Sequence, residues 1–230
     1  MTNKVIVVIG ASRGIGKELV LQFAKEKSNT VIALSRNTEA MKSNFTAENI
    51  HSGFIDLMSE DLHVDMAKTL DQFPTVDIVI NNAGKLVNKP FLELTREDIN
   101  ACYQTNAIGV MHATQFMVGK MLEEGGHIVN ISTMGAFQGS VKFPGLSAYS
   151  TSKAGITSFT ELFAEEYKDT KIKMNCLCLG ATQTEMLEEA FPGLQAPISA
   201  SEMAEFIVDF AYTAPKFFNG KVLPVSSTTP

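Results

Sequence analysis

The stretch Val5–Gly16, which reads VIVVIGASRGIG, decides the fold of this chain. Its first five residues are apolar and mostly β-branched, as is typical of a strand buried on both faces of a parallel sheet. A glycine-rich turn follows, and apolar side chains then recur at helical spacing as far as Ala24. Glycines let the backbone approach a pyrophosphate closely, while a helix N-terminus offers free N–H groups and a positive dipole end. The order strand, glycine turn, helix therefore predicts a nucleotide-phosphate site.

The rest of the chain alternates between strand patterns and helix patterns. Further strands are expected at Val31–Leu34, Gly53–Ile55, Val76–Asn81, His127–Ser132, Lys173–Leu179 and Lys221–Val225. Helices are expected near 60–72, 96–123, 149–168 and 201–213, with helix-starting caps at Thr95 with Asp98 and at Ser199 with Glu202. This alternation implies a doubly wound α/β Rossmann fold, with about seven parallel strands and helices on both faces. Residues 1–230 are expected to form a single dinucleotide-binding and catalytic domain.

Composition argues against several classes of protein. The chain has 230 residues, and 45% of them are hydrophobic, which suits a globular protein with a large core. Its net charge is −6 and its basic residues are scattered, which argues against a nucleic-acid surface. No apolar run approaches the roughly 18 residues that span a membrane, and the N-terminal run is too short for a signal peptide. The 3 cysteines and 4 histidines suggest neither a disulfide framework nor a metal site, so a reducing cytoplasm is the expected setting.

Tyr149 and Lys153 form the candidate catalytic pair. They stand four residues apart at the start of a helical pattern, so a helix places the phenol and the ammonium on one face. A cation beside a phenol favours the phenolate and lowers the pKa of the phenol. A group whose ordinary pKa is about 10 is thereby brought towards the range of proton transfer at neutral pH.

With these motifs the chain resembles the short-chain dehydrogenase/reductase family over nearly its whole length. The residues that carry the resemblance are Gly10, Gly14, Gly16, Asp56, Asn81, Asn82, Ala83, Gly84, Asn106, Tyr149 and Lys153. The resemblance implies that Tyr149 exchanges the proton and that Lys153 also holds the nicotinamide ribose. It implies that Asn106 positions a water linking Lys153 to solvent. It also implies that Asp56 meets the adenine ring and that the segment 81–84 lies along the cofactor.

The fourth catalytic position falls on Ser132 or Thr133. The family places a serine after its fifth strand, where the hydroxyl holds the substrate oxygen. Strand register against the family's usual double-serine pattern favours Thr133, whose hydroxyl donates the same hydrogen bond. Ser132 is the alternative donor to the substrate oxygen. Alternation along the strand would instead point its side chain to the opposite face, as a structural hydroxyl at the strand end. The family's Pro-Gly after the sixth strand reads Leu179-Gly180 here, and Thr184 matches the threonine at the nicotinamide end of the cofactor.

The end of the second strand distinguishes NADP from NAD. Residues 33–37 read ALSRN, without a carboxylate to bond a ribose 2′-hydroxyl. Arg36 can bind a 2′-phosphate there, and Arg13 in the glycine turn can close on it from the other side. The expected cofactor is therefore NADP(H). The expected cofactor-binding residues are Gly10, Ser12, Arg13, Gly14, Ile15, Gly16, Arg36, Asp56, Leu57, Asn82, Ala83, Gly84, Tyr149, Lys153, Gly180, Thr182 and Thr184.

The expected function is that of an NADP(H)-dependent oxidoreductase, which interconverts a carbonyl and an alcohol on a small molecule. Two alternatives are an NAD-dependent alcohol dehydrogenase and a non-catalytic NADP-binding redox sensor, since a fold does not determine a function. The intact Asn106, Tyr149 and Lys153 argue against the sensor, which has no evident need for a proton relay.

Apolar residues near the catalytic positions either line the substrate or pack a lid against the sheet. They are Met134, Phe137, Phe143, Leu146, Met186, Leu187 and Phe191. Residues 181–200, which contain two prolines, are the expected substrate lid. The resemblance also implies a homodimer or homotetramer through the fourth and fifth helices. Four apolar residues there belong either to the interface or to the core: Phe116, Phe159, Leu162 and Phe163.

Overall fold

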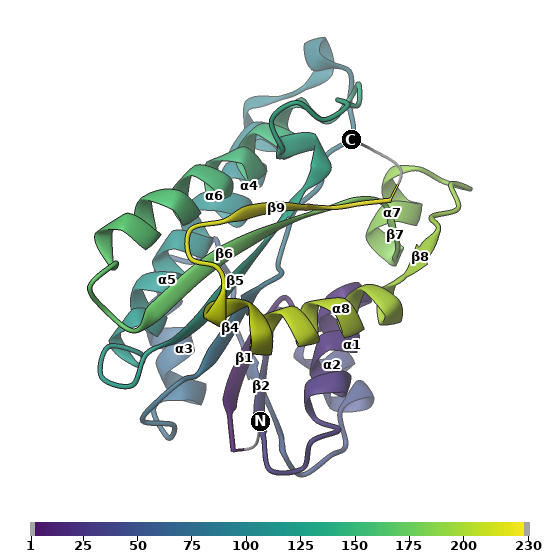
Figure 1. Ribbon diagram of the computed structural model, residues 1–230. Helices are drawn as coiled ribbons and strands as arrows, with labels where there is room; N and C mark the ends of the chain where they lie inside the picture. The colour runs from purple at the N-terminus through teal and green to yellow at the C-terminus, as the bar shows by residue number, and fades with distance from the viewer. Residues whose placement is uncertain (1–2, 228–230) are drawn as a thin grey trace.

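A seven-stranded sheet, with the order β3-β2-β1-β4-β5-β6-β9, lies at the centre of the computed structural model, which describes residues 3–227 (Figure 1). Its strands are β1 Val5–Ile9, β2 Thr30–Ser35, β3 Ile50–Phe54, β4 Ile78–Asn81, β5 Gly126–Thr133, β6 Ile172–Leu179 and β9 Val222–Val225. Every neighbouring pair is parallel. The strand order reverses between β1 and β4, which gives the doubly wound topology that the alternating pattern predicts.

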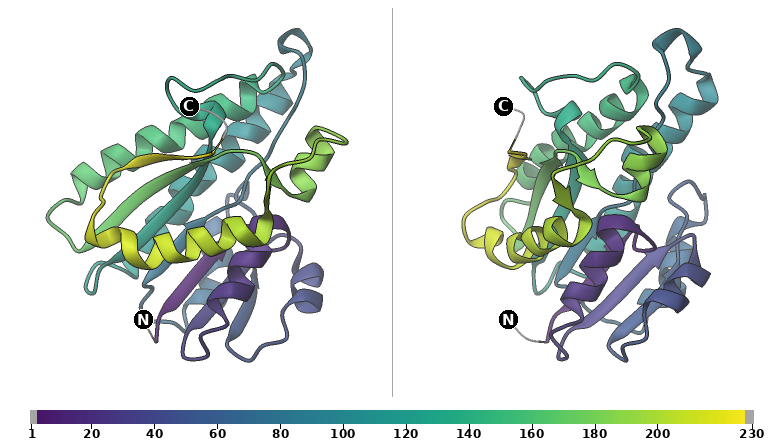
Figure 2. Two further views of the ribbon diagram at one scale, coloured as in Figure 1. Left: turned by 45° about the vertical axis from the view of Figure 1, so that its right-hand side comes forward. Right: turned by 90° about the vertical axis from the view of Figure 1, so that its right-hand side faces the viewer.

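Helices cover both faces of the sheet. One face carries α1 Gly14–Phe23, α2 Thr38–Asn44 and α8 Ala200–Thr213, and α1 and α8 lie side by side in Figure 2. The other face carries α3 Leu62–Leu70, α5 Gly109–Gly119 and α6 Ser147–Glu166, and α4 Arg96–Tyr103 lies against α6. Within residues 3–227 no helix is long and apolar enough to cross a membrane.

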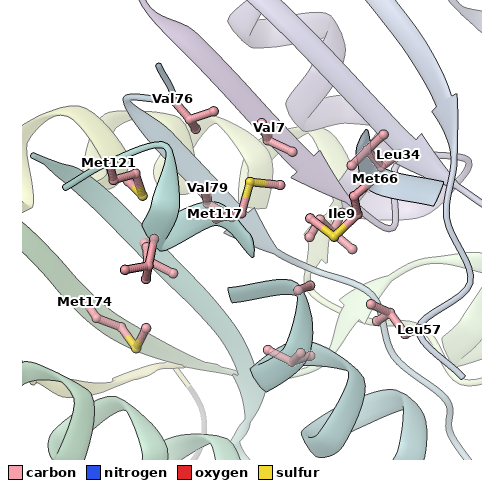
Figure 3. Packing of buried hydrophobic residues seen from close by; sticks show 14 of the residues in the cluster. Val7, Ile9, Leu34, Leu57, Met66, Val76, Val79, Met117, Met121 and Met174 are labelled. Carbon is pink, nitrogen blue, oxygen red and sulfur yellow. The ribbon is translucent and has the colours of Figure 1, made fainter. Parts of the chain in front are cut away.

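Strand β1 illustrates why both faces are buried. Successive side chains of a strand point to opposite faces. Val7 and Ile9 accordingly enter the cluster beneath α3, α5 and α6, which Figure 3 shows filled by methionines such as Met66 and Met117. Ile6 and Val8 enter the cluster beneath α1 and α8. A continuous apolar strand therefore meets a helical layer on each side.

The helix expected over 96–123 is interrupted. It consists of α4, a π-helical turn η2 at Gln104–Ile108, and α5. The amide of Gly109 donates to the carbonyl of Gln104, the i→i+5 pattern of a π turn. At Gly109 an added Cβ would lie 2.2 Å from the carbonyl oxygen of Leu57, so the chain passes very close to the segment after β3. Apolar periodicity does not reveal one extra residue in a turn. The sequence therefore predicts one continuous helix over 96–123 and does not indicate the π turn.

A buried line of polar side chains ties the sheet to α6 beneath the carboxyl ends of its strands. Asn81 Nδ2 on β4 donates to Asn130 Oδ1 on β5 at 2.7 Å. Asn130 Nδ2 in turn donates to Thr160 Oγ1 on α6 at 2.9 Å. Buried polar groups are costly unless paired, so these bonds fix the relative positions of β4, β5 and α6.

His127 at the start of β5 makes stability depend on pH. It is 2% exposed, its Nδ1 donates to the carbonyl of Ala211 at 2.9 Å, and its Nε2 accepts from Asn175 Nδ2 at 3.0 Å. Burial lowers the pKa of His127 from 6.5 to about 4. Between these values the unfolded chain binds a proton that the folded chain does not. Stability is therefore unaffected above pH 6.5 and falls as the pH drops towards 4.

At pH 5 the loss from this one histidine is expected to be about 2 kcal/mol. Urea unfolding of the wild type and of His127→Gln at about pH 7.5 and about pH 5 measures it. The glutamine variant should start from a lower stability but lose about 2 kcal/mol less between the two pH values. An equal loss in both proteins would show that His127 is not the cause.

Candidate active site

A cavity of about 610 Å³ opens at the carboxyl ends of the parallel strands. It runs from the turn after β1, past the ends of β2 and β3, to the ends of β5 and β6. In doubly wound sheets this edge is where ligands bind. Every expected cofactor-binding residue except Gly16 lines the cavity.

The glycine turn after β1 is shaped for a close approach. Gly10 has a φ of +89°, and an added Cβ would lie 2.6 Å from the amide nitrogen of Ala83 in the segment after β4. Asn82 Nδ2 donates to the Gly10 carbonyl at 2.9 Å and fastens the two segments together. Gly16 lies behind this turn, because a Cβ there would lie 2.0 Å from the Gly10 carbonyl oxygen. Gly16 therefore packs α1 against the turn, and its expected role in cofactor binding stays a prediction.

The start of α1 faces the cavity through Gly14 and Ile15. The residue before the helix, Arg13, has extended backbone, and no described side chain caps the helix start. Free N–H groups at a helix N-terminus form an anion-binding site. The turn thus keeps the features of a pyrophosphate site.

Tyr149 and Thr133 meet at the inner part of the cavity. Tyr149 lies in the first turn of α6, and Thr133 ends β5. The Thr133 hydroxyl lies close enough to the phenol of Tyr149 to lower its pKa, and Thr133 Oγ1 accepts from the amide of Gly135 at 3.3 Å. Both residues line the cavity, where an oxygen of a bound ligand could contact the two hydroxyls.

Ser132 has a different orientation from Thr133. Its Oγ donates to the backbone carbonyl of Lys153 at 3.1 Å and so joins β5 to α6. It is 3% exposed, although it borders the cavity. The Ser132 side chain thus makes a structural hydrogen bond to α6, whereas the Thr133 side chain lies near Tyr149. The two side chains point to opposite faces of β5, as alternation along a strand predicts.

Lys153 lies one helical turn after Tyr149 on α6 and is almost fully buried. It is 3% exposed, and its Nζ donates to the Ile131 carbonyl at 2.8 Å and to the Ala83 carbonyl at 3.2 Å. These bonds hold the ammonium between β5 and the segment after β4, beside the cavity. A buried cation without a counter-ion is costly, which favours a site where an anionic or polar ligand completes its surroundings.

The pKa values of the catalytic pair differ from the sequence-based expectation. Burial raises the pKa of Tyr149 to about 12, and the nearby Thr133 hydroxyl opposes this rise. Burial also lowers the pKa of Lys153 to about 8. The expected lowering of the tyrosine pKa by the lysine is therefore not found here: burial dominates the shift, and the ammonium of Lys153 makes no resolved contribution to it. At neutral pH Tyr149 carries its proton and can act as an acid.

Asn106 lies at the centre of the π turn η2 and is fully buried. Its Oδ1 accepts from the amide of Lys85 at 2.7 Å, and its Nδ2 donates to the Lys85 carbonyl and to Ser152 Oγ, both at 2.9 Å. Ser152 in turn donates to the Tyr149 carbonyl at 2.8 Å. The side chain thus fastens the segment after β4 to the catalytic turn of α6. It does not line the cavity, so its expected role with water stays a prediction.

The outer end of the cavity lies at the ends of β2 and β3. Arg36 and Asp56 both line it, and Arg36 is exposed without a polar partner in residues 3–227. Asp56 Oδ1 accepts from the amide of Met58 at 3.0 Å, which shapes the turn after β3. Arg13 also lines the cavity but is bonded to Glu189, a partner 176 residues away that no local pattern indicates.

The segment after β6 covers the other side of the cavity. It contains β7 Thr182–Gln183, α7 Glu185–Ala190 and β8 Ile198–Ser199, of which α7 has the N-cap Thr184. The expected substrate-lining residues here and in the 134–146 loop contribute to the cavity, with the exception of Phe137, which packs on the core. The sequence did not indicate several other lining residues, among them Leu86, Thr105, Glu185 and Leu194.

The comparisons with known proteins agree with this geometry. Residues 4–195 match the family described as short chain dehydrogenase. A 3-oxoacyl-[acyl-carrier-protein] reductase of Synechocystis sp. is 29% identical over 96% of this chain and 88% of its own. The structure of ElxO with NADP bound is 27% identical and has a TM-score of 0.85, covering 98% of this chain and 97% of that one. An actinorhodin polyketide ketoreductase variant with NADPH is 26% identical over 97% of this chain and 95% of that one, again with a TM-score of 0.85.

The chain therefore belongs to the short-chain dehydrogenase family. It is an oxidoreductase that acts on carbonyl and alcohol groups, as the resemblance implied. The residues present fit a nicotinamide dinucleotide: the cavity has a glycine cradle and an uncapped helix start at one end and a buried ammonium and two hydroxyls at the other.

Proposed function

We propose that this protein is an NADP(H)-dependent oxidoreductase that reduces a carbonyl group on a largely apolar small molecule, or oxidises the corresponding alcohol. The convergence of Tyr149, Thr133 and Lys153 beside one cavity carries the proposal. A sensor without turnover has no need for two hydroxyls and a buried ammonium together at the inner part of a nucleotide cavity.

The nicotinamide ring supplies or accepts the hydride when the cofactor is bound. Thr133 donates a hydrogen bond to the substrate oxygen and positions it against Tyr149. Tyr149, protonated at neutral pH, gives its proton to that oxygen as negative charge develops on it. Lys153, held by two carbonyls, stabilises the tyrosinate that remains and bonds the ribose of the cofactor.

The charges at the outer end of the cavity support NADP(H). Arg36 is exposed, lines the cavity and has no polar partner among the described residues, so it is available to a 2′-phosphate. The end of β2 lacks the carboxylate that would bond a 2′-hydroxyl. Two relatives of known structure carry NADP or NADPH.

Arg36→Asp is expected to lower kcat/KM for NADPH by about 10- to 100-fold relative to NADH, because it removes charge-assisted bonds to the phosphate and adds repulsion. Steady-state kinetics with both cofactors measure the ratio. Arg96→Asp, which makes the same change of charge on α4 outside the cavity lining, is the control. If Arg36→Asp left the ratio of kcat/KM for NADPH to that for NADH unchanged, Arg36 would not be the residue that recognises the 2′-phosphate.

The substrate side of the cavity supports an apolar compound. It is lined by Leu86, Met134, Phe143, Leu146, Met186, Leu187, Phe191 and Leu194. Such a lining favours a substrate with a hydrophobic body around its carbonyl. The Synechocystis relative is named as a reductase of 3-oxoacyl groups on acyl carrier protein, and a ketone on an acyl chain suits this lining. We take residues 181–200 as the lid over this end.

The test is to mix the purified protein with NADPH and a panel of carbonyl compounds and to follow the loss of NADPH absorbance. The panel holds 3-oxoacyl thioesters of increasing chain length, diketones, quinones, aldehydes and keto-steroids. Turnover that improves with apolar chain length supports the proposal. Tight NADPH binding without turnover on any compound would favour the cofactor-sensing function instead.

We also propose that the protein assembles in the cytoplasm as a homodimer or homotetramer through α4 to α6. Of the expected interface residues, Phe163 belongs to the core, and Phe116 and Phe159 are partly buried against it, whereas Leu162 is 68% exposed on α6. Ile99 and Tyr103 on α4 add exposed apolar surface. Light scattering measures the mass, and a monomer would contradict the assembly.

A further inference from the structure

The arginine of the glycine turn is already occupied by a residue of the lid. Arg13 Nη2 donates to Glu189 Oε2 at 3.0 Å, and its Nη1 bonds the other carboxylate oxygen. A guanidinium and a carboxylate that meet through two parallel bonds form the geometry that arginine also uses for phosphate. Glu189 therefore stands where an anionic group of a ligand would have to stand to use the same two donors.

This ion pair connects the two sides of the cavity. Arg13 belongs to the turn after β1, and Glu189 lies on α7, whose neighbouring residues line the cavity. The end of α7 is held a second time, because Asn88 Nδ2 donates to the Ala190 carbonyl at 2.9 Å. The lid helix is thus fastened to the glycine turn by one contact and to the segment after β4 by another.

The ion pair is weak enough to exchange. The side chains of Arg13 and Glu189 are 48% and 61% exposed. Solvent-exposed ion pairs add at most about a fivefold factor to an equilibrium. A phosphate offers more charge and three acceptor oxygens, so it outcompetes a single exposed carboxylate for the same guanidinium.

We propose that Glu189 is a specificity-determining residue, which competes with the 2′-phosphate of the cofactor for Arg13. A 2′-phosphorylated nucleotide takes Arg13 and releases α7 from the glycine turn, whereas a nucleotide without that phosphate leaves the pair closed. This inference rests on the proposed preference for NADP(H). In this proposal Arg13 pairs with Glu189 when no 2′-phosphate is bound and with the 2′-phosphate when the cofactor is bound. Recognition of the phosphate is thereby coupled to the position of the lid helix α7.

Binding of adenosine 2′,5′-bisphosphate and of 5′-AMP, measured by calorimetry, tests the competition. Glu189→Gln should bind the bisphosphate about two- to fivefold more tightly than the wild type does and bind 5′-AMP equally well. Glu188→Gln is the matched control, because this neighbour on the same helix accepts from the amide of Gly193 and not from Arg13. An unchanged affinity for the bisphosphate in Glu189→Gln would overturn the proposal.

A fluorescent reporter on the lid tests the release of α7. The chain contains no tryptophan, so Leu194→Trp places a single one in the lid. The bisphosphate should shift its emission in the otherwise wild-type protein, and 5′-AMP should not. In the Glu189→Gln background the shifted emission should be present before ligand is added. An equal response to both ligands would contradict the coupling.

The two proposals fail differently. If neither nucleotide binds, the cofactor site itself is wrong and the inference falls with it. If both nucleotides bind and the bisphosphate binds more tightly, but Glu189→Gln leaves both affinities unchanged, the NADP(H) preference stands and only the role of Glu189 is refuted.

Discussion

Tyr149→Phe is expected to lower kcat by about 10²- to 10⁴-fold, because the variant lacks the only hydroxyl proposed to give a proton to the substrate oxygen. The rest of the site should remain intact, because the phenylalanine ring fills the same space in the first turn of α6. The Kd of NADPH should therefore stay within about twofold of the wild-type value. Steady-state kinetics on the best carbonyl of the panel and a fluorescence titration with NADPH measure the two quantities.

Tyr103→Phe is a suitable control, because Tyr103 is 38% exposed on α4 and lies outside the cavity lining. It should keep wild-type kcat and KM. A Tyr149→Phe protein with wild-type kcat would refute the proton-transfer mechanism, whatever its affinity for NADPH.

Thr133→Ala is expected to lower kcat by about 10²- to 10³-fold, the usual effect of removing a donor from the oxygen on which charge develops. Thr133→Ser keeps the hydroxyl and should restore most of this activity. The kinetic comparison of the alanine and serine variants separates the loss of the hydrogen bond from the loss of packing by the methyl group.

Ser132→Ala distinguishes the two hydroxyls. Its bond runs to the Lys153 backbone, so its removal should lower stability more than turnover. Thermal unfolding together with kcat measures both effects. A large fall in kcat with Ser132→Ala and a small one with Thr133→Ala would reverse the roles that we propose.

Much of the fold and the core of the site could be predicted because both depend on short-range patterns. The β-branched run at Val5–Ile9 can be buried only between two layers, and the glycine turn that follows it has few other uses. The spacing of Tyr149 and Lys153 requires only a helix to bring them onto one face, and α6 provides it. Both capping boxes, at Thr95 and at Ser199, form as their spacing predicts.

The remaining features depend on contacts between distant segments. The pairing of Arg13 with Glu189 joins residues with no local relation, so the arginine alone indicated only a ligand. Phe137 is as apolar as Phe143, but the short turn after β5 directs it to the core and leaves Phe143 at the cavity. The high pKa of Tyr149 also escaped prediction, because the extent of burial is a property of the folded site.

The π turn at Gln104–Ile108 has a consequence for how this gene can change. Deleting one codon there would restore a regular helix and rotate all that follows by about 100° relative to α4. Asn106 would lose its hold on Lys85, and the apolar stripe of α5 would turn away from the sheet. Insertions and deletions that a surface helix tolerates are therefore forbidden in this segment, and length variants of this protein should cluster elsewhere, in its exposed loops.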